Sequence, residues 1–144
     1  MSKTEGAPSE YTLHVDGHGA VVSLRGRATE QLFTEIIAEL TGHPDFHLNL
    51  PSVWDMRETE GFGEMSRAEL SRLVMISRQA RAGATGYRVA MVAGKTLDYG
   101  VGRMLGGTVE RGEVMDVAVF YDFEEARRWA FGRGQPPAAG ADTA

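Results

Sequence analysis

Four histidines are the first residues of this chain whose spacing suggests chemistry, and they form two pairs, His14 with His18 and His43 with His47. Two histidines four residues apart can ligate one metal ion when both lie on the same helix. The first pair spans an expected strand and its turn, and Pro44 interrupts any helix through the second pair. The chain has no cysteine, which excludes a thiolate zinc site. We therefore expect neither a metal site nor a cofactor.

Two glycine-containing segments resemble parts of nucleotide-binding motifs. Residues 93–96 (AGKT) resemble the end of a phosphate-binding loop, but Val89 stands where that motif needs its first glycine. The glycines of residues 100–107 lie within a helical pattern, whereas a dinucleotide fingerprint directly follows a strand. The sequence also has no Gly-x-Ser-x-Gly nucleophile elbow. We therefore expect that the protein is not an enzyme.

The candidate ligand-binding residues are Asp55, Lys95, Tyr99 and Arg103. Ligands of open α/β sheets bind beyond the carboxyl ends of the strands, where these residues are expected to lie. Tyr99 and Arg103 are four residues apart on an expected helix, so their side chains would face one ligand together or stack on each other. Asp55 lies near the end of a buried strand, where a carboxylate needs a partner. It either ties down the following loop, residues 58–65, or contacts a ligand.

Local patterns in the first half of the chain predict a hairpin, a helix and a strand. Residues 11–15 and 20–25 are β-prone runs on either side of an Asp-Gly-His-Gly turn signal. Residues 52–56 predict a short, largely apolar strand. Between them, a helix ends at Gly42 and Pro44. Its apolar residues repeat along one face and are Leu32, Phe33, Ile36, Ile37 and Leu40.

The second half alternates helices with strands. Ser66 and Glu69 form a capping box at the start of a long helix. Residues 88–93 are a nearly continuous apolar run, which is typical of a parallel strand buried on both faces. The remaining expected elements are a glycine-weakened helix over residues 97–105, a strand over residues 117–121 and a helix over residues 123–131 that Asp122 caps. This alternation predicts an α/β fold with a mostly parallel sheet, helices on its faces and an N-terminal β-hairpin.

Length and composition indicate one globular domain. The chain has 144 residues, of which 42% are hydrophobic and 24% are charged, as in an ordinary globular protein. Residues 11–133 are expected to form the domain, and residues 1–10 and 134–144 are expected to be disordered tails. No stretch is apolar enough for a signal peptide or a membrane span, so we expect a cytoplasmic protein without integral membrane insertion.

The charge distribution argues against nucleic-acid binding. The net charge is −5, whereas binding to phosphates needs a positive surface. Residues 67–103 nevertheless contain seven basic residues and only two acidic ones. These arginines either cover helix surfaces with their long stems or form a surface for an anionic partner.

Four segments resemble a known family in their order and spacing, and they are residues 53–57 (VWDMR), 87–92 (YRVAMV), 99–104 (YGVGRM) and 119–129 (VFYDFEEARRW). Over residues 11–131 the chain is similar to the SpoIIAA-like family, which belongs to the STAS and SEC14-like fold group. The resemblance implies a compact α/β domain. Better-known STAS proteins use a phosphorylatable serine at the start of the second helix as a switch. Ser66 stands nearest to that position but lacks the flanking residues of the motif, so we expect a plain helix N-cap there.

The resemblance implies two kinds of function. The first is a non-enzymatic regulatory or protein-interaction domain that binds a protein partner or associates with itself as a homo-oligomer. The alternative is a carrier of a small amphipathic, lipid-like or anionic ligand, with residues 97–107 as a gate. An interaction domain predicts an exposed apolar patch, for instance around Met75, Met104 and Leu105, whereas a carrier predicts an enclosed apolar cavity.

Overall fold

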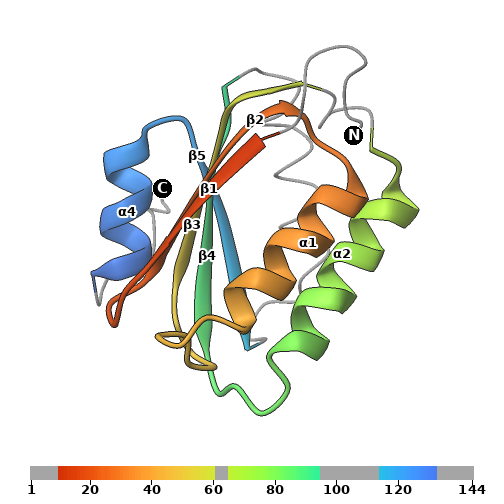
Figure 1. Ribbon diagram of the computed structural model, residues 1–144. Helices are drawn as coiled ribbons and strands as arrows, with labels where there is room; N and C mark the ends of the chain where they lie inside the picture. Colours follow the sequence, from red (N-terminus) through yellow and green to blue (C-terminus); the bar gives the residue numbers. More distant parts are fainter. Residues whose placement is uncertain (1–9, 61–64, 95–113, 133–144) are drawn as a thin grey trace.

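The computed structural model describes residues 10–60, 65–94 and 114–132. These residues form a five-stranded sheet with the strand order β1-β2-β3-β4-β5 (Figure 1). The strands are β1 (Glu10–Val15), β2 (Ala20–Arg27), β3 (Ser52–Glu60), β4 (Tyr87–Val92) and β5 (Met115–Phe120). The helices are α1 (Glu30–Thr41), α2 (Arg67–Ala80) and α4 (Phe123–Phe131).

The sheet has the topology that the sequence predicts. β1 and β2 form an antiparallel hairpin, in which the carboxylate of Asp16 accepts hydrogen bonds from the backbone N–H groups of His18 (2.8 Å) and Gly19 (3.2 Å). Such bonds stabilise a tight turn. The pairs β2–β3, β3–β4 and β4–β5 are parallel. The expected α/β fold, mostly parallel with an N-terminal hairpin, is therefore confirmed.

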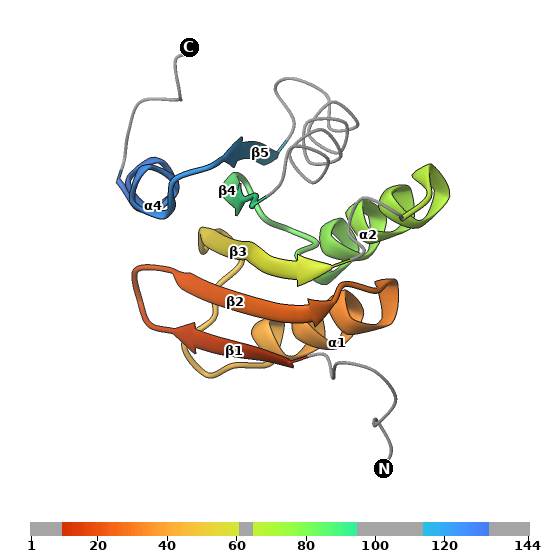
Figure 2. The same cartoon turned by 90° about the horizontal axis from the view of Figure 1, so that it is seen from above.

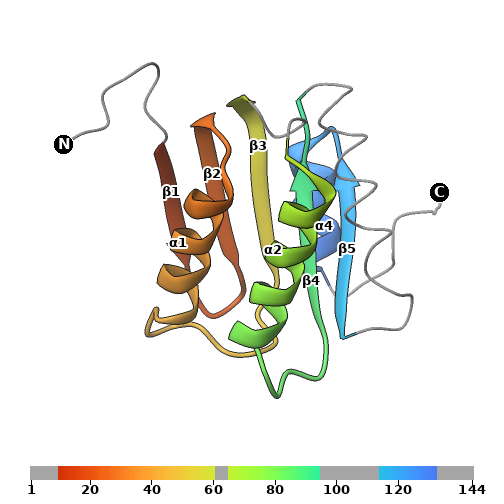
Figure 3. The ribbon, with the colours of Figure 1, turned by 90° about the vertical axis from the view of Figure 1, so that its right-hand side faces the viewer.

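The helices form a layer on each side of the sheet. α1 and α2 lie next to each other on one face, and α4 lies on the opposite face (Figure 2 and Figure 3). All five residues of the apolar stripe of α1 are buried, and each large apolar side chain buried in this way stabilises the fold by about 1.5–3 kcal/mol. On the opposite face, α4 buries Ala126, Trp129 and Ala130 in a second cluster that includes Val53 and Val92.

Side-chain caps explain where the helices begin. Each described helix follows a residue whose side chain accepts a hydrogen bond from a backbone N–H three residues further on, and these residues are Thr29, Ser66 and Asp122. Such caps satisfy backbone donors that have no partner within the helix. The caps at Ser66 and Asp122 are those that the sequence predicts.

β3 is longer than the sequence predicts. We expected a strand ending at Met56 and a loop over residues 58–65, but β3 continues to Glu60. β2 extends as well and supplies the backbone partners, with Arg27 opposite Glu60. Thr59 is buried, and its hydroxyl donates a hydrogen bond to the carbonyl of Met56 (2.8 Å). The prediction that residues 58–60 belong to a loop is therefore wrong, because backbone pairing and alternate burial outweigh the charged residues of this segment.

Some sequence predictions fall outside the described residues. They are the helix over residues 97–105, most of each tail and the side chains of Lys95, Tyr99 and Arg103. Within the described ranges, no helix is both long and apolar enough to cross a membrane.

Candidate functional site

Asp55 of the predicted site lies in β3, where it faces the α4 side of the sheet and pairs with Arg57. The carboxylate accepts hydrogen bonds from Nε (2.9 Å) and Nη2 (2.7 Å) of Arg57. Burial opposes ionisation of Asp55, but the hydrogen bonds from Arg57 outweigh it and lower the pKa of the carboxyl group. Arg57 also lies over the ring of Phe123, with its Cζ 5.7 Å from the ring centroid. Asp55 thus joins its own strand to the start of α4.

The other three predicted ligand-binding residues cannot be placed around Asp55. Lys95, Tyr99 and Arg103 all lie outside the described residues. Their convergence with Asp55 at the carboxyl edge of the sheet stays a prediction.

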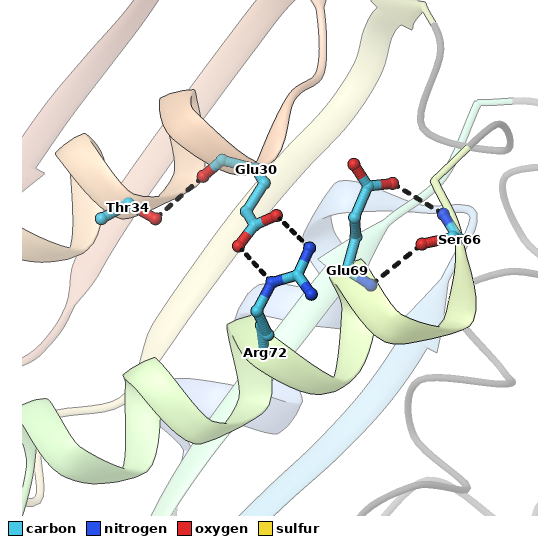
Figure 4. Close-up of polar contacts among 5 residues, drawn as sticks. All are labelled: Glu30, Thr34, Ser66, Glu69 and Arg72. Atoms are coloured by element: carbon cyan, nitrogen blue, oxygen red, sulfur yellow. Dashed lines mark hydrogen bonds and ion pairs between the residues drawn. The ribbon is translucent and has the colours of Figure 1, made fainter.

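Ser66 has the geometry of a capping box. Its Oγ accepts a hydrogen bond from the backbone N–H of Glu69 (3.1 Å), and its own backbone N–H donates to the Glu69 carboxylate (2.8 Å). Figure 4 shows both bonds beside the paired side chains of Arg72 and Glu30, which join α2 to α1 (2.9 Å for each bond). The hydroxyl of Ser66 thus has the structural role that the sequence predicts.

The arginines between residues 67 and 103 do not gather on one surface of the described part of the chain. Arg72 pairs with Glu30 between the two helices of one face. Arg88 donates a hydrogen bond to the carbonyl of Trp129 in α4 (2.6 Å), on the opposite face. Arg81 is buried, with only 6% of its surface exposed. The anionic-partner surface that this stretch suggested is therefore not formed by these three arginines together.

A cavity of about 70 Å³ lies between the sheet and the helices α1 and α2. Its walls are mostly apolar and include Phe33, Ile37, Leu40, Trp54, Leu73, Val74, Val89, Met91 and Met115. Two of its polar residues are satisfied within the fold: the Ser52 hydroxyl accepts from Trp54 Nε1 (3.0 Å), and the Thr41 hydroxyl donates to the carbonyl of Ile37 (2.9 Å). An apolar space of this kind holds apolar groups rather than water.

Arg81 forms the charged end of this cavity, at the C-cap of α2. Its Nη1 donates hydrogen bonds to the carbonyls of Leu48 (3.1 Å) and Leu50 (2.6 Å) in the segment after α1. Burial lowers the pKa of the guanidinium to about 10, so it remains charged at neutral pH. Arg81 forms no ion pair with any residue in the described ranges. A buried cation without a carboxylate partner is costly, and an anion beside it would remove that cost.

Tyr87, at the start of β4, lies directly against Arg81. The Cζ of Arg81 is 4.0 Å from the centroid of the Tyr87 ring, a distance at which the cation is attracted to the ring face. The Tyr87 hydroxyl is buried and has no hydrogen-bond partner among the residues that the structure describes. Burial raises the pKa of this hydroxyl, so at neutral pH it carries its proton and can donate a hydrogen bond.

A more open recess of about 230 Å³ adjoins this end of the cavity. Arg81, Tyr87 and Met115 line both the recess and the cavity. Arg78 adds a second cationic side chain to the recess, and none of the described residues that line either space is acidic. The combined space is therefore apolar at one end and positively charged at the other.

Sequence reasoning did not single out Arg81 or Tyr87, although a signal was present. Leu70, Val74, Ser77 and Arg81 follow one another at intervals of four, three and four residues. That spacing continues the inward stripe of α2 to Arg81. The site also lies at the amino ends of β4 and β5, whereas the rule for open α/β sheets directed attention to their carboxyl ends.

One solved structure similar to this chain is that of an uncharacterised DUF3478-family protein from Shewanella loihica with a SpoIIAA-like fold. The match has a TM-score of 0.55 and 13% sequence identity, and it covers 90% of this chain and 98% of the other. The likeness shows that this chain has a SpoIIAA-like fold, as the sequence resemblance implied. The sequence matches no protein-family model and no curated protein.

Proposed function

We propose that this chain is a non-enzymatic binding domain that holds a small, mostly apolar molecule in the cavity beneath α1 and α2. The observation that carries the proposal is the cavity itself, because its apolar walls meet a recess through which a ligand can enter. An enclosed apolar cavity is what a carrier or sensor requires. The large apolar residues that are exposed on the described part of the chain, among them Leu48, Met75 and Tyr121, lie in separate segments of the sequence.

Methionine methyl groups offer a direct test of this proposal. Met91 and Met115 line the cavity, whereas Met75 is 56% exposed on the outer side of α2. Titration of hexanol into protein with methyl-labelled methionine should shift the NMR signals of Met91 and Met115 and leave that of Met75 in place. Native mass spectrometry of the freshly purified chain would also detect a small molecule that purifies with it.

A matched pair of substitutions on α2 locates the binding space. Ser77 lines the cavity and Ser71 is exposed on the same helix. Ser77→Leu should fill the cavity and abolish the shifts that hexanol causes, while Ser71→Leu should leave them unchanged. Equal shifts at all methionines, or binding that survives Ser77→Leu, would contradict the proposed function.

A second candidate function is the binding of a protein partner. The observation that favours it is a groove of about 350 Å³ on the α4 side of the sheet, over β1, β2 and β3. Among the described residues, α4 packs chiefly on β3, β4 and β5, and Phe131 at its end lies against Gly19 of the hairpin turn. The groove is lined by charged and polar residues, which include Glu10, Ser23, Arg25, Asp55, Arg57 and Glu58. A partner, or a second copy of the chain, would bind here through complementary charges.

Charge reversal tests this second candidate. Arg25 pairs with Glu10 across the hairpin (3.5 Å) and lies at the groove. If the groove joins copies of the chain, native mass spectrometry should detect an oligomer that Arg25→Glu dissociates and that Arg78→Glu, on the other side of the sheet, does not. A chain that is monomeric at all concentrations would contradict self-association.

A further inference from the structure

The cavity has two hydrogen-bonding groups that the fold does not satisfy, and both lie at the same end. The hydroxyl of Tyr87 has no partner in the described ranges, and the residue is only 5% exposed. The guanidinium of Arg81 uses only Nη1, so Nε and Nη2 donate to no residue that the structure describes. Buried donors are normally paired, and the exceptions require an explanation. Here Tyr87 and Arg81, which are neighbours, both have hydrogen-bond donors without an acceptor among the described residues.

The charges around these donors select an anion. Arg81 is a buried cation, and Arg78 lies close enough for its charge to act on the Tyr87 hydroxyl. No acidic side chain of the described residues lines the cavity or the recess beside Arg81. A guanidinium presents its N–H groups as a planar fork that matches the two oxygens of a carboxylate.

The position of the donors also orients the ligand. Arg81 and Tyr87 line both the apolar cavity and the recess, so they lie where the two spaces meet. A charged head group bound at this boundary stays close to water, whereas an apolar tail attached to it reaches between Phe33, Trp54 and Met91. The cavity of about 70 Å³ admits a short tail rather than a long acyl chain.

From these observations we infer that the ligand is a carboxylic acid with a short apolar tail, bound as the carboxylate by Arg81 and the Tyr87 hydroxyl. This inference rests on the proposed function and adds to it the chemical class of the ligand and the two residues that recognise its head group. Neither residue belongs to the site predicted from the sequence, which was expected at the opposite ends of the strands.

Three probes of equal length and different head groups test the inference by isothermal titration calorimetry, and they are hexanoate, hexanol and hexylamine. A hydrogen bond to a charged group contributes about 1.5–3 kcal/mol, so hexanoate should bind at least about tenfold more tightly than hexanol. Hexylamine should bind more weakly than hexanol, because its ammonium group meets Arg81 and Arg78.

Variants assign the selectivity to the two residues. Tyr87→Phe removes only the hydroxyl and should weaken hexanoate binding about tenfold, while hexanol binding stays the same. Arg81→Lys keeps the charge and should retain part of the preference for hexanoate, whereas Arg81→Met should abolish it. Arg25→Met, on the other face of the sheet, is the matched control and should bind all three probes as the natural chain does. If Arg81→Met does not fold, Tyr87→Phe alone decides.

The outcomes separate this inference from the proposed function. Equal affinity for hexanoate and hexanol, or a preference for hexanoate that Tyr87→Phe leaves intact, overturns the inference but keeps the cavity as a binding site. Failure of all three probes to bind overturns both.

Discussion

The hydroxyl groups of Tyr87 and Tyr11 differ in their hydrogen bonding, and the effect of this difference on stability can be measured. The Tyr87 hydroxyl is buried without a partner in the described part of the chain, whereas the Tyr11 hydroxyl donates a hydrogen bond to Glu39 of α1. An unsatisfied buried donor costs about 1–3 kcal/mol. In the ligand-free protein, Tyr87→Phe should therefore leave the free energy of unfolding unchanged or raise it by about 1 kcal/mol.

Tyr11→Phe is the matched substitution for this prediction. It deletes a hydroxyl that has a partner, so it should lower the free energy of unfolding by about 0.5–1.5 kcal/mol. Urea unfolding of both variants provides the comparison. A loss of stability in Tyr87→Phe as large as that in Tyr11→Phe would indicate that the Tyr87 hydroxyl has a partner after all.

The Asp55–Arg57 pair predicts part of the acid sensitivity of the protein. Because the pKa of Asp55 is lowered in the folded state, the unfolded chain binds the proton more readily. The stabilisation is present above the unfolded pKa and is lost at acidic pH, as the pH falls from the unfolded pKa through the folded pKa. Asp55→Asn should remove this part of the pH dependence of the free energy of unfolding.

Arg57→Met is the counterpart on the other side of the pair. Without the guanidinium, burial is opposed only by the hydrogen bond from the backbone N–H of residue 57, so the pKa of Asp55 should be higher than in the natural chain. Urea titrations over this pH range compare the two variants with the natural chain. Parallel pH profiles for all three proteins would mean that the pair does not affect acid stability.

At the scale of the elements, α2 depends on its first turn. Ser66→Ala removes the side-chain acceptor of the capping box and should cost about 0.5–2 kcal/mol. Ser66→Asp also provides an acceptor and adds a negative charge at the helix N-terminus, so its stability should be close to that of the natural chain. Thermal unfolding measures both effects. If Ser66→Asp instead released a bound partner protein that Ser66→Ala retains, a phosphoswitch at Ser66 would gain support.

The apolar stripes of α1 and α2 hold these helices on the sheet. Ile36 of α1 is fully buried and Leu73 of α2 is 7% exposed. Truncation of either to alanine should cost about 2–5 kcal/mol, because it leaves a cavity in the core. Met75→Ala, on the exposed side of α2, should change stability by less than about 0.5 kcal/mol. Denaturant unfolding that ranks Met75→Ala with the other two would contradict this arrangement.

At the scale of the whole molecule, a close approach between β3 and Gly94, the second residue after β4, constrains the fold. A Cβ atom at Gly94 would lie 2.7 Å from the carbonyl oxygen and 2.9 Å from the Cα of Arg57. These are backbone atoms, so Gly94→Ala should force the two strands apart at a cost of about 1–3 kcal/mol. A Cβ atom at Gly86 would meet nothing within 4 Å. Gly86→Ala should therefore leave the stability unchanged. Differential scanning calorimetry of the two variants measures both effects.

Most of the architecture could be predicted because its signals are local. The stripe from Leu32 to Leu40, the capping box at Ser66 and the hairpin turn at Asp16 each depend on residues close together in the chain. The extension of β3 was missed because it depends on pairing with β2, which no local pattern reveals.

The candidate site was harder to predict because it depends on burial. Arginine is almost always exposed, so Arg81 was counted among surface charges. Its position opposite Tyr87 arises only when the end of α2 and the start of β4 come together at one end of the sheet. The segment after α1, whose carbonyls hold Arg81, gives no sign of this role in the sequence.

The described strands lie side by side in the same order as in the sequence, from β1 to β5, and this is also the order of their synthesis on the ribosome. A nascent chain can therefore form the hairpin first and add each later strand to an edge that is already complete. No pair formed early has to open to admit a later strand, but each parallel pair joins strands that are separated by a long stretch of chain, and such pairing is slow to form. Until β5 arrives, the newest strand is also the exposed edge, so the slow arrival of each crossover is the period in which the growing sheet is open to aggregation.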